Sequence, residues 1–124
     1  MKEKILIIDD EEMLIQMTKS ILKKRGFRIT ACLTAEESLP LIEKEKPDLI
    51  ILDYLLPGKN GIELCREIKS HPATSGIPIL MTTGQNLPAE PRPEEQEQSL
   101  GPDDFLTKPF EIENLLEKIE RLLK

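Results

Sequence analysis

Short, almost uninterrupted aliphatic runs stand out in the hydrophobic pattern of this 124-residue sequence. Three of them are strong: KILIID at 4–9, DLIILD at 48–53 and IPILMTT at 77–83. Continuous apolar runs of this length are typical of strands that are covered on both faces of a parallel sheet. Weaker runs around 27–31 and at 104–107 bring the number of predicted strands to five.

Amphipathic patterns with a helical period lie between these runs. The first ends near Gly26, a residue type suited to a helix C-terminal cap. Its expected buried side consists of Leu14, Met17 and Ile21. Two further helices are predicted at about 35–44 and at 62–70. The last helical pattern follows the fifth strand, and its expected buried stripe consists of Ile112, Leu115, Ile119 and Leu122.

Strands and helices alternate along the chain, and this alternation predicts an α/β fold. The expected architecture is a doubly wound, five-stranded parallel sheet with helices on both faces and right-handed crossovers. A chain of 124 residues is of ordinary size for one domain. Because the sequence has no internal repeat and no linker, we expect a single domain over residues 1–124.

One segment between the fourth and fifth strands departs from this alternation. The stretch 84–101 contains Pro88, Pro91 and Pro93 and has few apolar residues. A short helix that starts with Pro93 in its first turn and stops at Gly101 fits the pattern, but it would bury little surface. We therefore expect marginal order in this segment.

Composition argues against several classes of function. The formal net charge is −6 and the pI is about 4.9, which disfavours direct binding of nucleic acid or of an anionic membrane. The apolar runs are too short to span a bilayer or to form a signal peptide, so a cytoplasmic protein is expected. Cys32 and Cys65 have neither metal-ligand spacing nor a nearby histidine, which predicts ordinary buried thiols.

Polar residues stand at the C-terminal ends of four predicted strands. They are Asp9 and Asp10, Asp53, Thr82 and Thr83, and Lys108. In a doubly wound sheet the C-terminal strand ends form one edge, where ligands bind. These side chains are therefore expected to meet in one crevice.

Three carboxylates at close range repel one another unless a cation offsets their charge. Oxygen ligands with room for water suit Mg²⁺, with Mn²⁺ as a substitute, better than zinc. A carboxylate beside a metal ion, an ammonium and a hydroxyl suits phosphoryl transfer, because carboxylates serve as nucleophiles that form aspartyl phosphates. Asp53, Lys108 and Thr83 supply the nucleophile, the ammonium and the hydroxyl.

Four motifs together resemble the receiver domain of response regulators in two-component signalling. They are IIDDEE at 7–12, ILDYLLPGKNG at 51–61, MTTG at 81–84 and DDFLTKPF at 103–110, in the family's order. The resemblance covers all five strands. It implies a flavodoxin-like fold with strand order 2-1-3-4-5 and a domain that accepts a phosphoryl group from a histidine kinase phosphohistidine in a Mg²⁺-dependent reaction.

The resemblance also implies roles for individual residues. Asp53 would be the phosphoacceptor and a metal ligand. Asp10 would bind Mg²⁺ directly, Asp9 would hold it mostly through water, and the backbone carbonyl of Leu55 would be a further ligand. Such a domain is not an enzyme in the ordinary sense, because it catalyses only its own phosphorylation and dephosphorylation.

A conformational switch is implied as well. Thr83 would provide the switch hydroxyl, although a shift of one residue would exchange it with Thr82. Lys108 would contact the phosphoryl group and precede a cis bond to Pro109. Phe105 stands where the family often has a tyrosine, so the second switch residue lacks a hydroxyl but is still expected to rotate inward.

Two further departures from the family pattern concern the same part of the chain. Pro102 replaces a residue that is usually small, and the stretch between Thr83 and Lys108 is longer than usual and rich in proline. The second departure falls where the family's fourth helix normally packs, and it therefore affects the family's usual output surface.

Alternative functions have recognisable requirements. A small phosphatase of the haloacid-dehalogenase type needs a second Asp two residues after the nucleophile, where this chain has Leu55. A flavin-binding module needs a phosphate loop where this chain has DDEE at 9–12. A phosphorylation-independent pseudo-receiver is a third alternative, and the complete acidic triad argues against it.

The expected partners follow from the resemblance. They are a sensor histidine kinase or phosphotransfer protein and, downstream, a protein target or a fused output domain, which these residues do not include. Leu116 and Leu123 flank the buried stripe of the last helix and are compatible with a weak dimer contact, so the expected oligomeric state is a monomer or a weak dimer.

Overall fold

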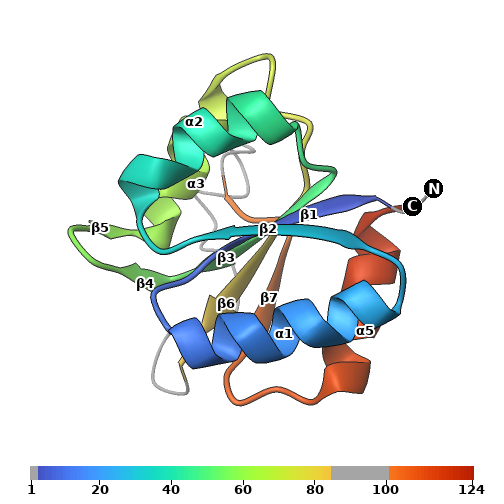
Figure 1. Ribbon diagram of the computed structural model, residues 1–124. Coiled ribbons are helices and arrows are strands. Elements are labelled where there is room, and N and C mark those ends of the chain that lie inside the picture. Colours follow the sequence, from blue (N-terminus) through green and yellow to red (C-terminus); the bar gives the residue numbers. More distant parts are fainter. Residues whose placement is uncertain (1–2, 85–100) are drawn as a thin grey trace.

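A five-stranded, fully parallel sheet with helices on both faces forms the body of the protein (Figure 1). The computed structural model describes residues 3–84 and 101–124. The strand order is β2-β1-β3-β6-β7, which is the predicted order 2-1-3-4-5 for five strands numbered along the chain. The predicted α/β, flavodoxin-like fold is confirmed.

The elements agree closely with the predicted ranges. The strands of the main sheet are β1 (Lys4–Ile8), β2 (Arg28–Cys32), β3 (Leu49–Asp53), β6 (Ile79–Thr83) and β7 (Asp104–Thr107). The helices of the described ranges are α1 (Glu12–Lys24), α2 (Ala35–Glu45), α3 (Gly61–Ser70) and α5 (Ile112–Leu122). A two-stranded hairpin, β4 (Leu55–Leu56) and β5 (Lys59–Asn60), precedes α3. The short helix expected at 93–101 lies largely outside the described residues.

Strand side chains alternate between two separate apolar layers, as the pleat requires. Figure 1 shows α2 and α3 over one face of the sheet and α1 and α5 over the other. On β1, for example, Leu6 and Ile8 join the layer under α2 and α3, whereas Ile5 and Ile7 join the layer under α1 and α5. Because both faces are covered, every strand residue of β3 is buried, which explains its continuous apolar run.

The prediction for the buried side of α1 was wrong. The residues that α1 buries are Ile15, Thr18 and Leu22, whereas Met17 is 50% exposed and Leu14 and Ile21 are only partly buried. The sequence of this helix contains two adjacent apolar stripes, the predicted one and another displaced by one residue. The second stripe is the one that packs against the sheet. Gly26 follows the helix with a φ of 95°, as expected for a C-terminal cap.

The ranges of the other helices and the burial of the two cysteines are as predicted, but the stripe predicted for the last helix was only partly right, because Ile112 and Leu122 are partly buried. On α5 the buried residues are Leu115, Leu116 and Ile119, so Leu116 belongs to the core. Cys32 and Cys65 are buried free thiols, and burial raises the pKa of Cys32 to about 11. Within the residues described, no helix has the length and apolar character needed to cross a membrane.

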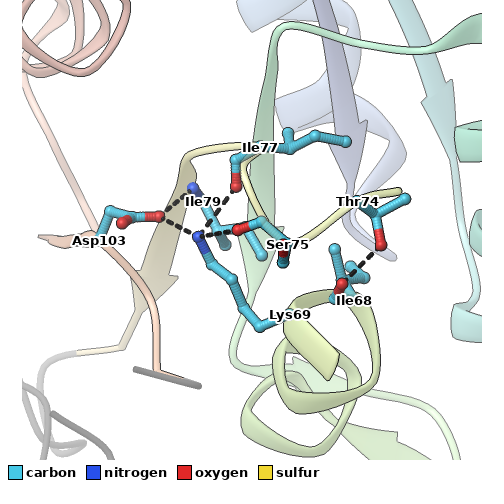
Figure 2. A network of polar contacts seen from close by, with 7 residues as sticks. All are labelled: Ile68, Lys69, Thr74, Ser75, Ile77, Ile79 and Asp103. Carbon is cyan, nitrogen blue, oxygen red and sulfur yellow. Dashed lines mark hydrogen bonds and ion pairs between the residues drawn. The ribbon is translucent and has the colours of Figure 1, made fainter. Parts of the chain in front are cut away.

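Lys69, whose side chain is largely buried, connects the N-terminal ends of β6 and β7 to α3 (Figure 2). The Lys69 ammonium donates hydrogen bonds to the carbonyl of Ile77 at 3.0 Å and to Oδ2 of Asp103 at 2.8 Å. The same Asp103 oxygen accepts from the backbone N–H of Ile79 at 2.8 Å. Lys69 thus connects three segments at the end of the sheet opposite the acidic residues.

Replacing Lys69 with methionine keeps an apolar stem but removes the cation beside the Asp103 carboxylate and the side-chain donor to the Ile77 carbonyl. The side chain of Lys69 is only 7% exposed, so we expect the free energy of unfolding to fall by about 2 to 3 kcal/mol in urea titrations. Lys118→Met is the matched control, because its ion pair with Asp104 is more exposed and should contribute less than about 1 kcal/mol. An equal loss in both variants would contradict this account of Lys69.

Candidate functional site

Three carboxylates meet at the C-terminal edge of the sheet, as the sequence predicted. Asp9 follows β1, Asp10 comes next, and Asp53 is the last residue of β3. Each offers an oxygen atom, and these atoms lie within 4.8 Å of one another. Asp9 and Asp53 are buried, while Asp10 is exposed to solvent. The cluster thus has a buried floor and an open side.

Lys108 closes the cluster from the loop after β7. Its ammonium lies 3.0 Å from Oδ2 of Asp9 and 3.3 Å from Oδ1 of Asp53. The backbone N–H of Lys108 donates to the carbonyl of Thr83 at 2.6 Å, and the bond from Lys108 to Pro109 is cis. The backbone pairing of β6 with β7 thus extends to Lys108, and this places the Lys108 ammonium beside the two buried carboxylates.

Glu11 is a member of the site that the sequence analysis did not identify. Its carboxylate accepts from the Lys108 ammonium at 2.9 Å, and its backbone N–H donates to Oδ1 of Asp9 at 2.9 Å. The only signal in the sequence was its position two residues after Asp9. An Asp side chain commonly accepts a hydrogen bond from the backbone N–H of the residue two positions later.

Burial and charge set the protonation of the central groups. Burial, together with the negative charge of Asp9, raises the pKa of Asp53 to about 6, although Lys108 and a backbone hydrogen bond at Leu55 oppose the rise. For Lys108, burial by itself lowers the pKa. Its hydrogen bonds to Glu11 and Asp9 and the charge of Asp53 outweigh this effect, so the pKa of Lys108 lies above its usual value.

The donor set fits a hard divalent cation. All three converging side chains are carboxylates, and one lysine offsets only part of their combined negative charge. Asp10 is exposed, so the open side of the cluster leaves access for water, which Mg²⁺ usually retains. The role predicted for the Leu55 carbonyl stays a prediction.

The loop after Asp53 is held by a tight backbone contact. The N–H of Gly61 donates to the carbonyl of Tyr54 at 2.6 Å, and a Cβ atom at position 61 would lie 2.5 Å from the backbone oxygen of Asp53. The Asn60 side chain caps α3 by accepting from the N–H of Glu63. Glycine at position 61 thus lets the helix start directly against the residue that carries the central carboxylate.

Thr82 and Thr83 occupy opposite faces of the sheet. Thr82 is the register partner of Asp53, whereas Thr83 lies one residue further and shares a face with Met81. Both hydroxyls are buried and have no hydrogen-bond partner within the described part of the chain. The switch role predicted for Thr83 stays a prediction.

Phe105 is already part of the core in this structure. It pairs in register with Met81, which places it diagonally from Thr83 on the same face. Only 6% of its surface is exposed. A further inward rotation of the ring would therefore gain little burial, and any switch at this position consists of repacking within the layer under α2 and α3.

Comparisons with known proteins agree on one family. Residues 5–120 match the family model described as the response regulator receiver domain. The chain is similar to the phosphate regulon transcriptional regulatory protein PhoB of Rhizobium meliloti (strain 1021), with 35% identity over 128 residues that cover 100% of this chain and 53% of that protein. It spans about half the length of the curated relatives it matches.

Solved structures of similar sequence have the same fold. The signal receiver domain of a signal transduction histidine kinase from Syntrophus aciditrophicus is 32% identical, with a TM-score of 0.83 over 98% of this chain and 89% of that one. A CheY-like response regulator receiver domain protein from Methanospirillum hungatei JF-1 is 31% identical, with a TM-score of 0.82 over 99% of this chain and 94% of that one.

The raised pKa of Asp53 predicts a dependence of stability on pH in the metal-free protein. Because its folded-state pKa of about 6 exceeds the ordinary value of 3.8, the folded protein binds more protons between these values and loses stability as pH rises through them. In EDTA we expect Asp53→Asn to be more stable than the natural chain at neutral pH by on the order of 2 kcal/mol.

Urea unfolding at several pH values tests this expectation. The difference between the two proteins should shrink as the pH falls from 7.5 towards about 4, because both then carry a neutral group at position 53. A difference that is the same at every pH would show that the substitution acts through packing and not through ionisation.

Proposed function

This chain belongs to the response regulator receiver domain family, and from this premise we propose that Asp53 accepts a phosphoryl group from a phosphohistidine. The observation that carries the proposal is the convergence of three carboxylates and Lys108 at one end of the sheet. No other cluster of carboxylates, cysteines or histidines that could hold a metal is found among the residues described.

The chemistry requires an ionised nucleophile. An Oδ atom of Asp53 attacks the phosphorus atom, the new O–P bond forms as the N–P bond of the phosphohistidine breaks, and the imidazole leaves. With a pKa of about 6, Asp53 is largely ionised at neutral pH. The Lys108 ammonium lies 3.3 Å from this carboxylate, where its positive charge would stabilise the negative charge of the transferred phosphoryl group.

Asp9, Asp10 and Asp53 would hold Mg²⁺, or Mn²⁺ in its place, with the Leu55 carbonyl as a further ligand. When bound, the ion supplies charge neutralisation for the phosphoryl oxygens. The protein contributes the orientation of the ligands, since Glu11 and Lys108 each hydrogen-bond to Asp9. In this proposal the domain promotes only its own phosphorylation and dephosphorylation.

The alternative functions lack support at the level of the site. A haloacid-dehalogenase-type phosphatase would need an acid at position 55, where Leu55 lies 59% exposed beside the cluster. A pseudo-receiver would tolerate loss of the acidic residues or the lysine, yet all of them converge here.

The proposed response of the protein runs through β6 and β7. A phosphoryl group on Asp53 adds negative charge and acceptor oxygens, which would attract the unpartnered Thr83 hydroxyl. Thr83 shares its face with Phe105, so its movement would change the packing of that ring. A change in packing that favours one of two conformations would shift the equilibrium between them.

The proposed partners follow from the same chemistry. A sensor histidine kinase or a phosphotransfer protein would supply the phosphoryl group in the cytoplasm. Since the matched relatives are about twice as long, and PhoB is described as a transcriptional regulatory protein, the output would lie in a fused domain or in a separate target protein. We propose a monomer or weak dimer.

Incubation with acetyl phosphate and Mg²⁺, followed by intact mass measurement, tests the central proposal. We expect a gain of one phosphoryl group in the natural chain, because Asp53 is the proposed nucleophile and its carboxylate lies 3.3 Å from the Lys108 ammonium. The gain should be absent in EDTA and in Asp53→Ala. Equal labelling of Asp53→Ala would falsify the assignment of the phosphoacceptor.

Beryllofluoride with Mg²⁺, which stands in for the phosphoryl group, tests the proposed response. We expect changes in amide hydrogen exchange at Thr83 and Phe105 in addition to changes around Asp53. In Thr83→Ala the changes around Asp53 should remain and those at Phe105 should disappear, because the hydroxyl is the link between them. Changes of equal extent in both proteins would rule out this route.

A further inference from the structure

A small cavity lies beside Asp9, on the side of the sheet covered by α1 and α5. Its volume is about 10 Å³. Most of its walls are apolar, including Ile15 of α1 and Leu115 of α5. Asp9, Thr18 and Thr82 also line it, so the cavity has polar groups that purely apolar cavities lack.

Thr82 is the polar residue of this cavity that the proposed function leaves without a role. Only 2% of its surface is exposed, and its hydroxyl has no hydrogen-bond partner in the part of the chain that the structure describes. A buried hydroxyl without a partner is destabilising compared with an apolar group of the same shape. Valine would fill position 82 equally well, so the hydroxyl calls for a physical explanation.

The register of the sheet places this hydroxyl close to the site. Thr82 is the Cα partner of Asp53, and parallel partners project to the same face. Asp9 lines the same cavity and also belongs to the carboxylate cluster, so it connects the two. A cavity of this size matches about one water molecule, and such a water needs at least two polar partners.

We propose that Thr82 is a positioning residue, which fixes the Asp9 carboxylate for Mg²⁺ through one water molecule held in this cavity. The water accepts from or donates to the Thr82 hydroxyl and donates to Asp9. This inference rests on the proposed function, because it concerns a residue that is proposed to hold the metal.

The arrangement has a physical reason. Asp9 is oriented by the N–H of Glu11 on Oδ1 and by the Lys108 ammonium on Oδ2. In the proposed reaction the Lys108 ammonium also interacts with the phosphoryl group, so its hydrogen bond to Asp9 weakens during the transfer. A donor in the cavity keeps the carboxylate oriented, and partners of this kind behind a metal ligand commonly change metal affinity by about 10- to 100-fold.

Two substitutions at position 82 separate the hydroxyl from the shape of the side chain. Thr82→Val keeps the shape and removes the hydroxyl, whereas Thr82→Ser keeps the hydroxyl. Mg²⁺ affinity is measured by titration of the fluorescence of Tyr54, the one tyrosine of the chain, which adjoins Asp53. We expect about tenfold weaker binding in Thr82→Val and a change of less than about twofold in Thr82→Ser.

A second measurement does not depend on metal. In the metal-free natural chain, a long-lived water should give NMR cross-relaxation to the methyl group of Thr82, and this signal should be lost in Thr82→Val. Unchanged Mg²⁺ affinity in Thr82→Val, or no such water signal in the natural chain, would overturn the inference. Failure of the natural chain itself to bind Mg²⁺ would instead refute the proposed function.

Discussion

Negative charge that is brought together and partly buried at the end of a sheet is the constraint on which the rest of this site depends. Asp9 and Asp53 are buried within 4.8 Å of each other and of Asp10, an arrangement that raises the pKa of Asp53 to about 6. Lys108 offsets part of this charge and gains its own raised pKa from it. The remaining negative charge makes the site suited to a divalent cation and to a phosphoryl group that binds with it.

The sheet makes this arrangement possible because it is rigid and covered on both faces. Parallel register aligns the ends of β1, β3 and β6, so residues far apart in sequence emerge at one edge. The two apolar layers also separate two groups of residues, with Thr82 and Asp53 on the side of α1 and α5, and Thr83 and Phe105 on the side of α2 and α3. One edge of the sheet thus presents two chemically different environments to the same site.

Differences between expectation and structure have physical causes that single-sequence patterns do not contain. The apolar pattern of α1 supports two stripes, and only the contact with β2 and β1 determines that Ile15 and Leu22 are buried and Met17 is exposed. Glu11 joins the site because a lysine 97 positions later reaches it. Phe105 is packed into the core already, which removes the gain in burial that a rotation from outside would provide.

Sequence patterns alone were enough to predict the strands, the helices and the convergence of Asp9, Asp10, Asp53 and Lys108. Continuous aliphatic runs that end in Asp9, Asp53, Thr83 and the stretch before Lys108 carry this information, because the pleat and the parallel order fix where such runs terminate. The tertiary structure was needed to establish which groups are paired, how far each carboxylate is buried, and which of the two adjacent threonines faces the layer under α1 and α5. Those properties depend on distances between strands and on the packing of helices over them, which local sequence patterns do not encode.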